Sequence, residues 1–232
     1  MRINYLTTCV NYVDFLAISY YHNRTEFDDF IVVTDSKDKH TQEFCSKHEV
    51  RMVITDKFYE NGAVFNKGLA LNEGLKALEN PEWVAIMDAD TFVAPRFKES
   101  LPKNLDKEVF YGARRVLLPD FESYKRLSQA SSLDGFEIPL GAGYGFFQLF
   151  HWGSKVIQDS PYGLWHPSFP DCRQSDWMFR NKWGDYKVGS DYTVCEGNFK
   201  ELSLLVYNLG EHGKNHFGRV TPNFLSQKSN LT

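Results

Sequence analysis

The sequence is poor in cysteine, and it lacks a long hydrophobic run. Its four cysteines include no Cys-x-x-Cys pair, so a structural zinc site of the usual spacing is not expected. No apolar run approaches the roughly 18 residues of a membrane span. No secretion signal precedes the first strand-like segment. We therefore expect reduced thiols, no membrane span and a cytoplasmic location.

The chain also lacks an excess of positive charge and the common phosphate-binding loops. Its formal net charge is −4, so a general attraction to nucleic acid is not expected. Neither Gly-x-Gly-x-x-Gly nor Gly-x-x-x-x-Gly-Lys-Ser/Thr occurs, which argues against a dinucleotide or P-loop site. Apolar residues make up 42% of its 232 residues, and aromatic residues make up 16%. That is enough for one large packed domain.

One stretch combines a buried strand with paired acids. Residues 83–87, Trp-Val-Ala-Ile-Met, form a short apolar run that ends in Asp88-Ala89-Asp90. On extended backbone the two carboxylates point to the same side. Held close together they repel each other, and hard oxygen ligands suit Mg²⁺ or Mn²⁺. A plain acidic loop is the alternative interpretation.

Upstream of this stretch, strands and helices alternate. Strands are predicted at 3–10, 30–34, 51–54 and 83–87, and helices at 13–21, 39–48 and 65–80. This order predicts an α/β fold with a mostly parallel sheet flanked by helices. Thr8, Asp35 and Asp88 fall at the carboxyl ends of strands, where such sheets bind ligands. Asp35 and Ser36 are also candidates to cap the next helix.

The second half of the sequence is less regular. The basic run 114–126, with Arg114, Arg115, Lys125 and Arg126, is either a solvated face or a contact for phosphate or an anionic acceptor. Strands are predicted at 146–151 and 203–208. Three further segments are candidates for function: glycines at 141, 143 and 145, an aromatic loop at 161–170, and a helix start that carries Asp176.

The order of these motifs resembles the GT-A glycosyltransferases, and most closely the β-1,4-galactosyltransferase and chondroitin-synthase-like branch. The likeness rests on Phe65-Asn66-Lys67-Gly68, which opens the helix before the Asp-x-Asp strand, and on Asp88-Ala89-Asp90 at the expected distance. It covers about residues 60–95, and more loosely 140–180. A family Arg is replaced here by Lys67, which lacks the bidentate fork.

The resemblance implies a role for each matching residue. Asp35 would accept a hydrogen bond from the base, Asn66 and Lys67 would hold the sugar nucleotide, and Thr8 lies at the same edge. Asp88 would face the ribose or the metal, and Asp90 would ligate Mn²⁺ or Mg²⁺. Outside this group, His212 would be the third metal ligand, with His216 as its rival, and Asp176 would be the general base. Its acidic surroundings are reduced to Ser175-Asp176, with Asp171 nearby.

The implied reaction moves a sugar from a nucleoside diphosphate sugar, with UDP favoured, to an acceptor hydroxyl with inversion. The acceptor is left open among a glycan, a protein, a small molecule and a modified DNA base. We expect a single domain over 1–232, with a sugar-nucleotide-binding half at 1–95 and an acceptor-side half at 96–232. A nucleotidyltransferase and a non-catalytic glycan- or partner-binding module are the alternatives.

Overall fold

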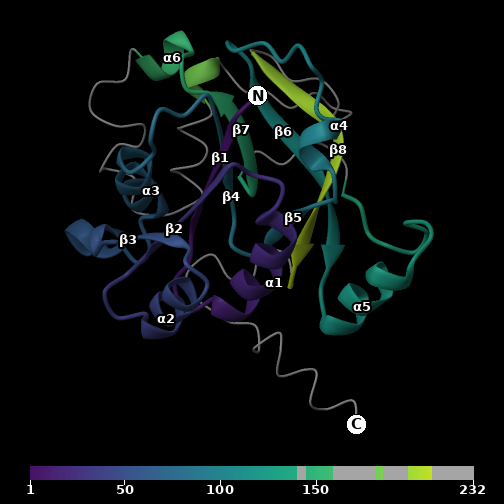
Figure 1. Cartoon of the computed structure of the whole chain (residues 1–232), viewed down its shortest axis with the longest axis horizontal. Helices are drawn as coiled ribbons and strands as arrows, with labels where there is room; N and C mark the ends of the chain where they lie inside the picture. The colour runs from purple at the N-terminus through teal and green to yellow at the C-terminus, as the bar shows by residue number, and fades with distance from the viewer. Residues whose placement is uncertain (140–144, 159–180, 185–197, 211–232) are drawn as a thin grey trace.

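The fold is known from a computed structural model, which describes residues 1–139, 145–158, 181–184 and 198–210 (Figure 1). Its strands are β1 (Ile3–Thr8), β2 (Asp29–Thr34), β3 (Arg51–Ile54), β4 (Trp83–Met87), β5 (Thr91–Val93), β6 (Phe110–Leu118), β7 (Phe147–His151) and β8 (Phe199–Leu209). Its helices are α1 (Val13–Asn23), α2 (Lys39–Lys47), η1 (Lys57–Gly62), α3 (Lys67–Lys76), α4 (Phe97–Ser100), α5 (Phe121–Gln129), α6 (Lys155–Gln158) and η2 (Asn181–Trp183).

The strands form one eight-stranded sheet in the order β3-β2-β1-β4-β7-β6-β8-β5. The first four pair in parallel, as do β6 and β8. Strand β7 runs antiparallel to both β4 and β6, and β5 runs antiparallel to β8. The predicted α/β fold with a mostly parallel sheet flanked by helices is therefore confirmed.

Both faces of the sheet are buried, because alternate residues of each strand enter different clusters. On β1, Leu6 packs in the cluster that contains α3, whereas Tyr5 packs on the opposite face with Phe97 of α4. Leu16 of α1 and Cys45 of α2 belong to another cluster with Val32 of β2. Figure 1 shows α2 and α3 beside β3 and β2, whereas α1 lies next to β5.

Several predicted boundaries differ from the structure. The helix expected at 65–80 is shorter, because the Asn66 side chain caps its start at Lys67 and Ala77 ends it. Asn80 lies beyond the helix with a φ of 47°. The cap of α2 is Asp38, whose side chain accepts from the Thr41 amide, so the expectation that Asp35 and Ser36 cap this helix is wrong.

Helix α3 lies very close to the sheet at Gly74. A Cβ built there would be 2.5 Å from Leu6 Cδ1 and 2.6 Å from Val33 Cγ2. Leu6 and Val33 are both fully buried, so neither methyl group can move away freely. Gly74 therefore sets the depth at which α3, and the residues at its amino end, rest on β1 and β2.

Replacing Gly74 with Ala is expected to destabilise the protein by about 1–3 kcal/mol, because the added methyl overpacks the core. The gain in helix propensity, roughly 0.5–1 kcal/mol, works in the opposite direction. Urea unfolding measures the net effect. Lys76→Ala, at an exposed position of the same helix (side chain 69% exposed), is the control, and stabilisation by Gly74→Ala would disprove the close approach.

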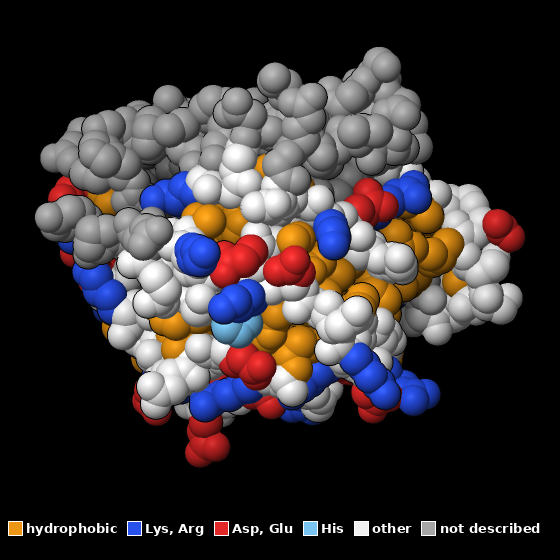
Figure 2. Space-filling model, turned by 90° about the horizontal axis from the view of Figure 1, so that it is seen from above, with side chains coloured by type: hydrophobic (Ala, Val, Ile, Leu, Met, Phe, Trp, Pro, Cys, Tyr) orange, Lys and Arg blue, Asp and Glu red, His pale blue; other side chains and the backbone are white. Residues whose placement is uncertain are grey.

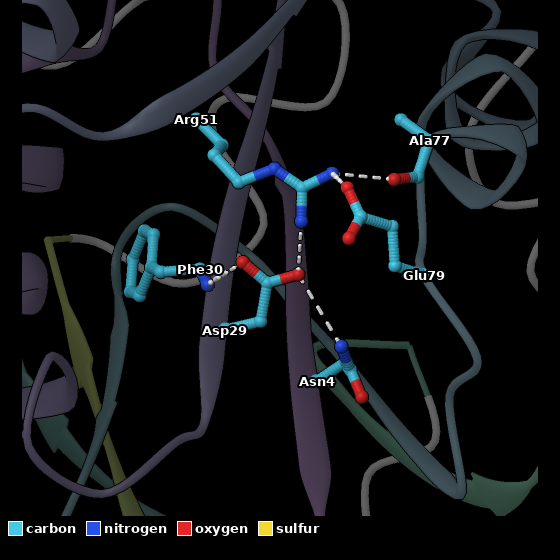
Figure 3. A network of polar contacts seen from close by, with 6 residues as sticks. All are labelled: Asn4, Asp29, Phe30, Arg51, Ala77 and Glu79. Carbon is cyan, nitrogen blue, oxygen red and sulfur yellow. Dashed lines mark hydrogen bonds and ion pairs between the residues drawn. The ribbon is translucent and has the colours of Figure 1, made fainter.

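Arg51 ties the other end of the sheet together (Figure 3). Its guanidinium contacts the Asp29 carboxylate at 2.5 Å, the Ala77 carbonyl at 2.6 Å and Glu79 at 3.3 Å. Asp29 also accepts from the Asn4 side chain at 3.3 Å. The network links β1, β2, β3 and the carboxyl end of α3, away from the strand ends where ligands are expected.

The face above the start of β1 carries acidic and basic side chains that are interspersed rather than gathered by sign (Figure 2). Near the start of β1, the Ile3 amide donates to Asp28, which also forms an ion pair with Lys98 at 2.6 Å. This view therefore shows no block of positive charge over the residues that the structure describes.

Candidate active site

The carboxyl ends of β2, β1 and β4 lie next to one another, since these strands are neighbours and parallel. Thr8 is the last residue of β1, Asp35 follows β2, and Asp88 follows β4. Thr8 and Asp35 are buried, whereas the Asp88 side chain is 39% exposed. The topology therefore brings the three predicted positions to one edge of the sheet, with Asp88 the most accessible.

Asp35 is held by three hydrogen bonds. One carboxylate oxygen accepts from the backbone amides of Lys37 and Asp38, each at 2.7 Å, and the other accepts from the Tyr59 hydroxyl at 2.8 Å. Burial, and then this bond to Asp35, raise the pKa of Tyr59 to about 12. Tyr59 also lines an open groove of about 480 Å³. The groove is lined by Lys37, Thr55, Asp56, Lys57, Tyr59 and Glu60.

Asn66 is the N-cap of α3. Its side-chain oxygen accepts from the Leu69 amide at 3.0 Å, and its backbone amide donates to the Phe58 carbonyl at 2.7 Å. Asn66 is almost fully buried. Within the described part of the chain its Nδ2 donor has no partner. A buried donor of this kind is uncommon and suits a ligand atom.

Lys67 joins α3 to the Asp-x-Asp segment. Its ammonium group lies 2.6 Å from an Asp88 carboxylate oxygen and 3.4 Å from the Gly145 carbonyl. The Lys67 side chain is only 5% exposed. Burial limits screening by water, so this pair is worth more than a surface ion pair. Lys67 is thus placed to hold Asp88 in a fixed position.

Asp90 is fixed from a distant part of the sequence. Its carboxylate accepts from the side-chain amide of Asn208 on β8 at 3.0 Å. Helix α1 holds the backbone on either side: the Ser19 hydroxyl donates to the Ala89 carbonyl at 2.7 Å, and the Asn23 amide donates to the Thr91 carbonyl at 3.0 Å. The sequence reading missed Ser19, Asn23 and Asn208, because their partners are remote in the chain.

The crossing from β4 to β5 is very short. Residues 88–90 join two strands that are four positions apart in the sheet. Four steps along the backbone reach about 14 Å, whereas four strand spacings in a flat sheet amount to about 19 Å. The sheet must therefore curve back on itself here, and Asp88 and Asp90 lie on the segment that closes this curve.

The charges at this edge are mixed. Burial, with the nearby Asp88 charge, raises the pKa of Asp90 to about 7, although Arg115 and Lys67 act in the opposite direction. Burial lowers the pKa of Arg115, against the charges of Asp88 and Asp90. Arg115 belongs to the basic run that the sequence reading left open between a solvated face and an anion contact. The structure places Arg115 partly buried and near the two acids.

The donor groups fit a hard divalent cation. Burial, and then the charge of Asp88, raise the pKa of Asp90, and a cation bound by both carboxylates would offset these two costs. Among the described residues, no group of three or more His, Cys, Asp or Glu side chains is placed to hold a metal. The predicted third ligand, His212 or His216, and the predicted base Asp176 lie outside the described residues.

Mn²⁺ affinity is expected to rise by up to roughly tenfold per pH unit below about pH 7 and to level off above about pH 8, since a proton on Asp90 competes with the metal. In metal-free protein, the free energy of unfolding changes with pH in the opposite direction to the metal affinity. The folded state keeps a proton that the unfolded state, with a pKa of 3.8, has released, so stability falls as pH rises from about 4 to 7. Calorimetric titration and melting at four pH values measure both; a flat metal affinity would contradict the raised pKa.

The family model for glycosyl transferase family 2 matches residues 7–184, more than half of the chain. The chain belongs to glycosyl transferase family 2. This membership confirms the prediction of a GT-A glycosyltransferase domain. No curated protein matches this chain.

Several solved structures have a fold similar to that of this family 2 chain. A fragment of TarS from S. aureus, in complex with UDP-GlcNAc, is 15% identical with a TM-score of 0.53, covering 96% of this chain and 62% of the fragment. GalNAc-T7 with UDP, GalNAc and Mn²⁺ is 11% identical with a TM-score of 0.60, covering 99% and 47%. Glucosyl-3-phosphoglycerate synthase from Mycobacterium tuberculosis is 13% identical with a TM-score of 0.53, covering 98% and 75%.

At these identities the likeness shows the fold alone. The family 2 chain spans less than two thirds of the TarS fragment and about half of GalNAc-T7. Within its described residues, no helix has both the length and the apolar character to cross a membrane.

Proposed function

We propose that this family 2 chain transfers a sugar from a nucleoside diphosphate sugar, with a UDP-sugar favoured, to an acceptor hydroxyl in a metal-dependent reaction. The observation that carries the proposal is the Asp88–Asp90 pair. It follows a buried strand at the ligand-binding edge of the sheet, and the pKa of Asp90 is raised to about 7. Two crowded carboxylates at this edge call for a cation, which a diphosphate accompanies.

Three solved structures of similar fold support the choice of nucleotide and metal. TarS is described with UDP-GlcNAc, GalNAc-T7 with UDP and Mn²⁺, and glucosyl-3-phosphoglycerate synthase with UDP and Mn²⁺. The motif that opens α3 supports a finer placement near the β-1,4-galactosyltransferase and chondroitin-synthase-like branch. The acceptor stays open among a glycan, a protein, a small molecule and a modified DNA base.

In this proposal the base of the donor binds beside Asp35. A carboxylate oxygen has two lone pairs, so the oxygen that accepts from Tyr59 can also accept from a uracil imide. The unpartnered Nδ2 of Asn66 is available as a donor to the nucleotide. Thr8, at the end of β1, lies between the strand ends that carry Asp35 and Asp88.

Asp88, Asp90 and His212 would hold Mn²⁺ or Mg²⁺, which when bound would offset the charge that grows on the leaving diphosphate. Lys67, bonded to Asp88, would add its positive charge beside the diphosphate. Asp176 would take the proton from the acceptor hydroxyl, a contribution of roughly 10²–10⁴-fold. Inversion follows from the resemblance, since one base attacks opposite the leaving group.

The division into a donor half at 1–95 and an acceptor half at 96–232 is part of the same proposal. The pairing of β4 with β7 joins the two halves in one sheet, which supports a single domain. A cytoplasmic location stays a prediction.

The test is isothermal titration of the protein with UDP, GDP, CDP and dTDP, each with Mn²⁺ and with EDTA. We expect UDP to bind with Mn²⁺ and to lose most of its affinity in EDTA. Release of sugar from the matching UDP-sugars without acceptor would then separate an enzyme from a binding module. Failure of all four nucleotides to bind would overturn the proposed function.

A further inference from the structure

Arg115 reaches the ligand-binding edge from β6, a strand outside the parallel half of the sheet. Tyr111 of β6 pairs with Leu149 of β7, which in turn pairs with Ala85 of β4. Both pairings are antiparallel, so β6 runs in the same direction as β4. Arg115 is four residues beyond Tyr111 and Asp88 is three beyond Ala85, which brings both toward the same edge of the sheet.

The guanidinium of Arg115 is held by a ring rather than by an acid. It lies over the Phe146 side chain, 4.3 Å from the ring centroid. Within the described residues, no carboxylate lies within ion-pair distance of it and no hydrogen bond reaches it. Asp88, Asp90 and Glu137 act on Arg115 only through longer-range charge. A partly buried cation in this state keeps its donors for another group.

The backbone around Arg115 is irregular in a way that aims this side chain. The register between β6 and β8 shifts between Ala113 and Arg114. Such irregularities bend a strand locally and often re-aim side chains beside functional sites. Arg114 and Arg115 are consecutive on a strand, so their side chains point to opposite faces, and only Arg115 shares the face of Phe146.

We propose that Arg115 is a phosphate ligand of the candidate active site, with Phe146 as the platform that fixes its guanidinium. The proposal rests on the proposed function. It selects, from the basic run 114–126 that the sequence left open between a solvated face and an anion contact, the one arginine that faces the site. The phosphate has two possible sources: the diphosphate of the donor, or a phosphate group on an anionic acceptor.

Charge balance explains why an anion belongs here. A divalent cation bound by Asp88 and Asp90 would neutralise their negative charge, so these two acids would no longer offset the positive charge of Arg115. A phosphate that bridges the cation and the guanidinium restores the balance, and the planar fork of arginine matches two phosphate oxygens. An arginine that only offset the two carboxylates would instead compete with the metal.

The experiment compares Arg115→Gln with wild type. Arg24→Gln is the matched control, since Arg24 is an exposed arginine that also lies over an aromatic ring, that of Tyr21. Arg115→Lys keeps the charge but loses the fork. For each protein, calorimetry measures binding of Mn²⁺ alone, of UDP with Mn²⁺, and of inorganic phosphate before and after saturation with UDP. Thermal melting verifies that each variant is folded.

If the donor is the source, Arg115→Gln weakens UDP binding roughly ten- to hundredfold. The UDP affinity of Arg115→Lys then lies between those of wild type and Arg115→Gln. Phosphate does not bind once UDP is present. If an acceptor is the source, UDP binding is unchanged, and phosphate binds the UDP complex of wild type but not that of Arg115→Gln. Arg24→Gln behaves as wild type in both cases.

The inference is overturned if wild type binds UDP while Arg115→Gln matches it for UDP and phosphate and binds Mn²⁺ more tightly. Arg115 would then only offset the acidic pair, and the proposed function would stand. If wild type fails to bind UDP but binds phosphate through Arg115, the proposed function falls and the phosphate site stands. Absence of both kinds of binding overturns both.

Discussion

Asp90→Asn is expected to abolish Mn²⁺-dependent UDP binding and to reduce sugar transfer by at least roughly a hundredfold. The variant keeps the shape of the side chain but removes one of the two charges that attract the cation. Loss of charge stabilisation at a reacting centre costs about 10²–10³ in rate. Calorimetry with UDP and Mn²⁺, and a transfer or hydrolysis assay with UDP-sugars, measure the two effects.

The same variant should not unfold the protein. The pKa of Asp90 is raised by burial and by Asp88, so its charge destabilises the folded state above pH 7. We therefore expect the melting temperature of Asp90→Asn at pH 8 to equal or exceed that of wild type. Asp134→Asn, at an exposed position, is the control for removal of one acid. Normal UDP affinity in Asp90→Asn would remove this residue from the site.

Lys67→Met is expected to cost about 1–3 kcal/mol of folding free energy and to weaken UDP binding roughly ten- to hundredfold. The 2.6 Å contact with Asp88 is lost, and the acid keeps part of its hydration because it is 39% exposed. The cost is therefore below that of breaking a fully buried pair. Without the ammonium group, repulsion between Asp88 and Asp90 increases as well.

A double-mutant cycle separates the ion pair from other effects of Lys67. Lys67→Met, Asp88→Asn and the double variant are compared by urea unfolding, and we expect a coupling energy of about 1–2 kcal/mol. Lys67→Arg keeps the charge and should restore part of the UDP affinity. Additive losses in the cycle would show that the two side chains act independently.

The parts of the fold that could be predicted are those in which local pattern and environment agree. The uninterrupted apolar run at 83–87 and the run at 51–54 are strands with the predicted bounds. Strand β6 was missed, because Arg114 and Arg115 interrupt its apolar pattern. Strand β5 has only three residues, too few for any periodicity to appear.

The candidate site also contains residues that local sequence indicates and residues that depend on distant contacts. The places of Asp35 and Asp88 at strand ends, with Asp90 two residues further on, could be predicted because the strands before them are recognisable; their roles stay a proposal. Asn208 could not be connected with Asp90, which lies 118 positions away. Ser19 and Asn23 are fully buried, yet on a helix they look like ordinary polar-face residues. Their role depends on which backbone segment packs against α1, and this cannot be inferred from the residues next to them in the sequence.

The contact between Asn208 and Asp90 has a consequence for the order in which the protein folds. Strand β8 is the last described strand to leave the ribosome, and its pairing with β5 and β6 closes loops of about a hundred residues. Such long-range pairings form slowly. The first four strands can assemble while Asp90 still lacks its partner amide. The contact that fixes Asp90 therefore forms only after β8 has been synthesised, so a nascent chain that lacks β8 should not hold Asp90 in this position.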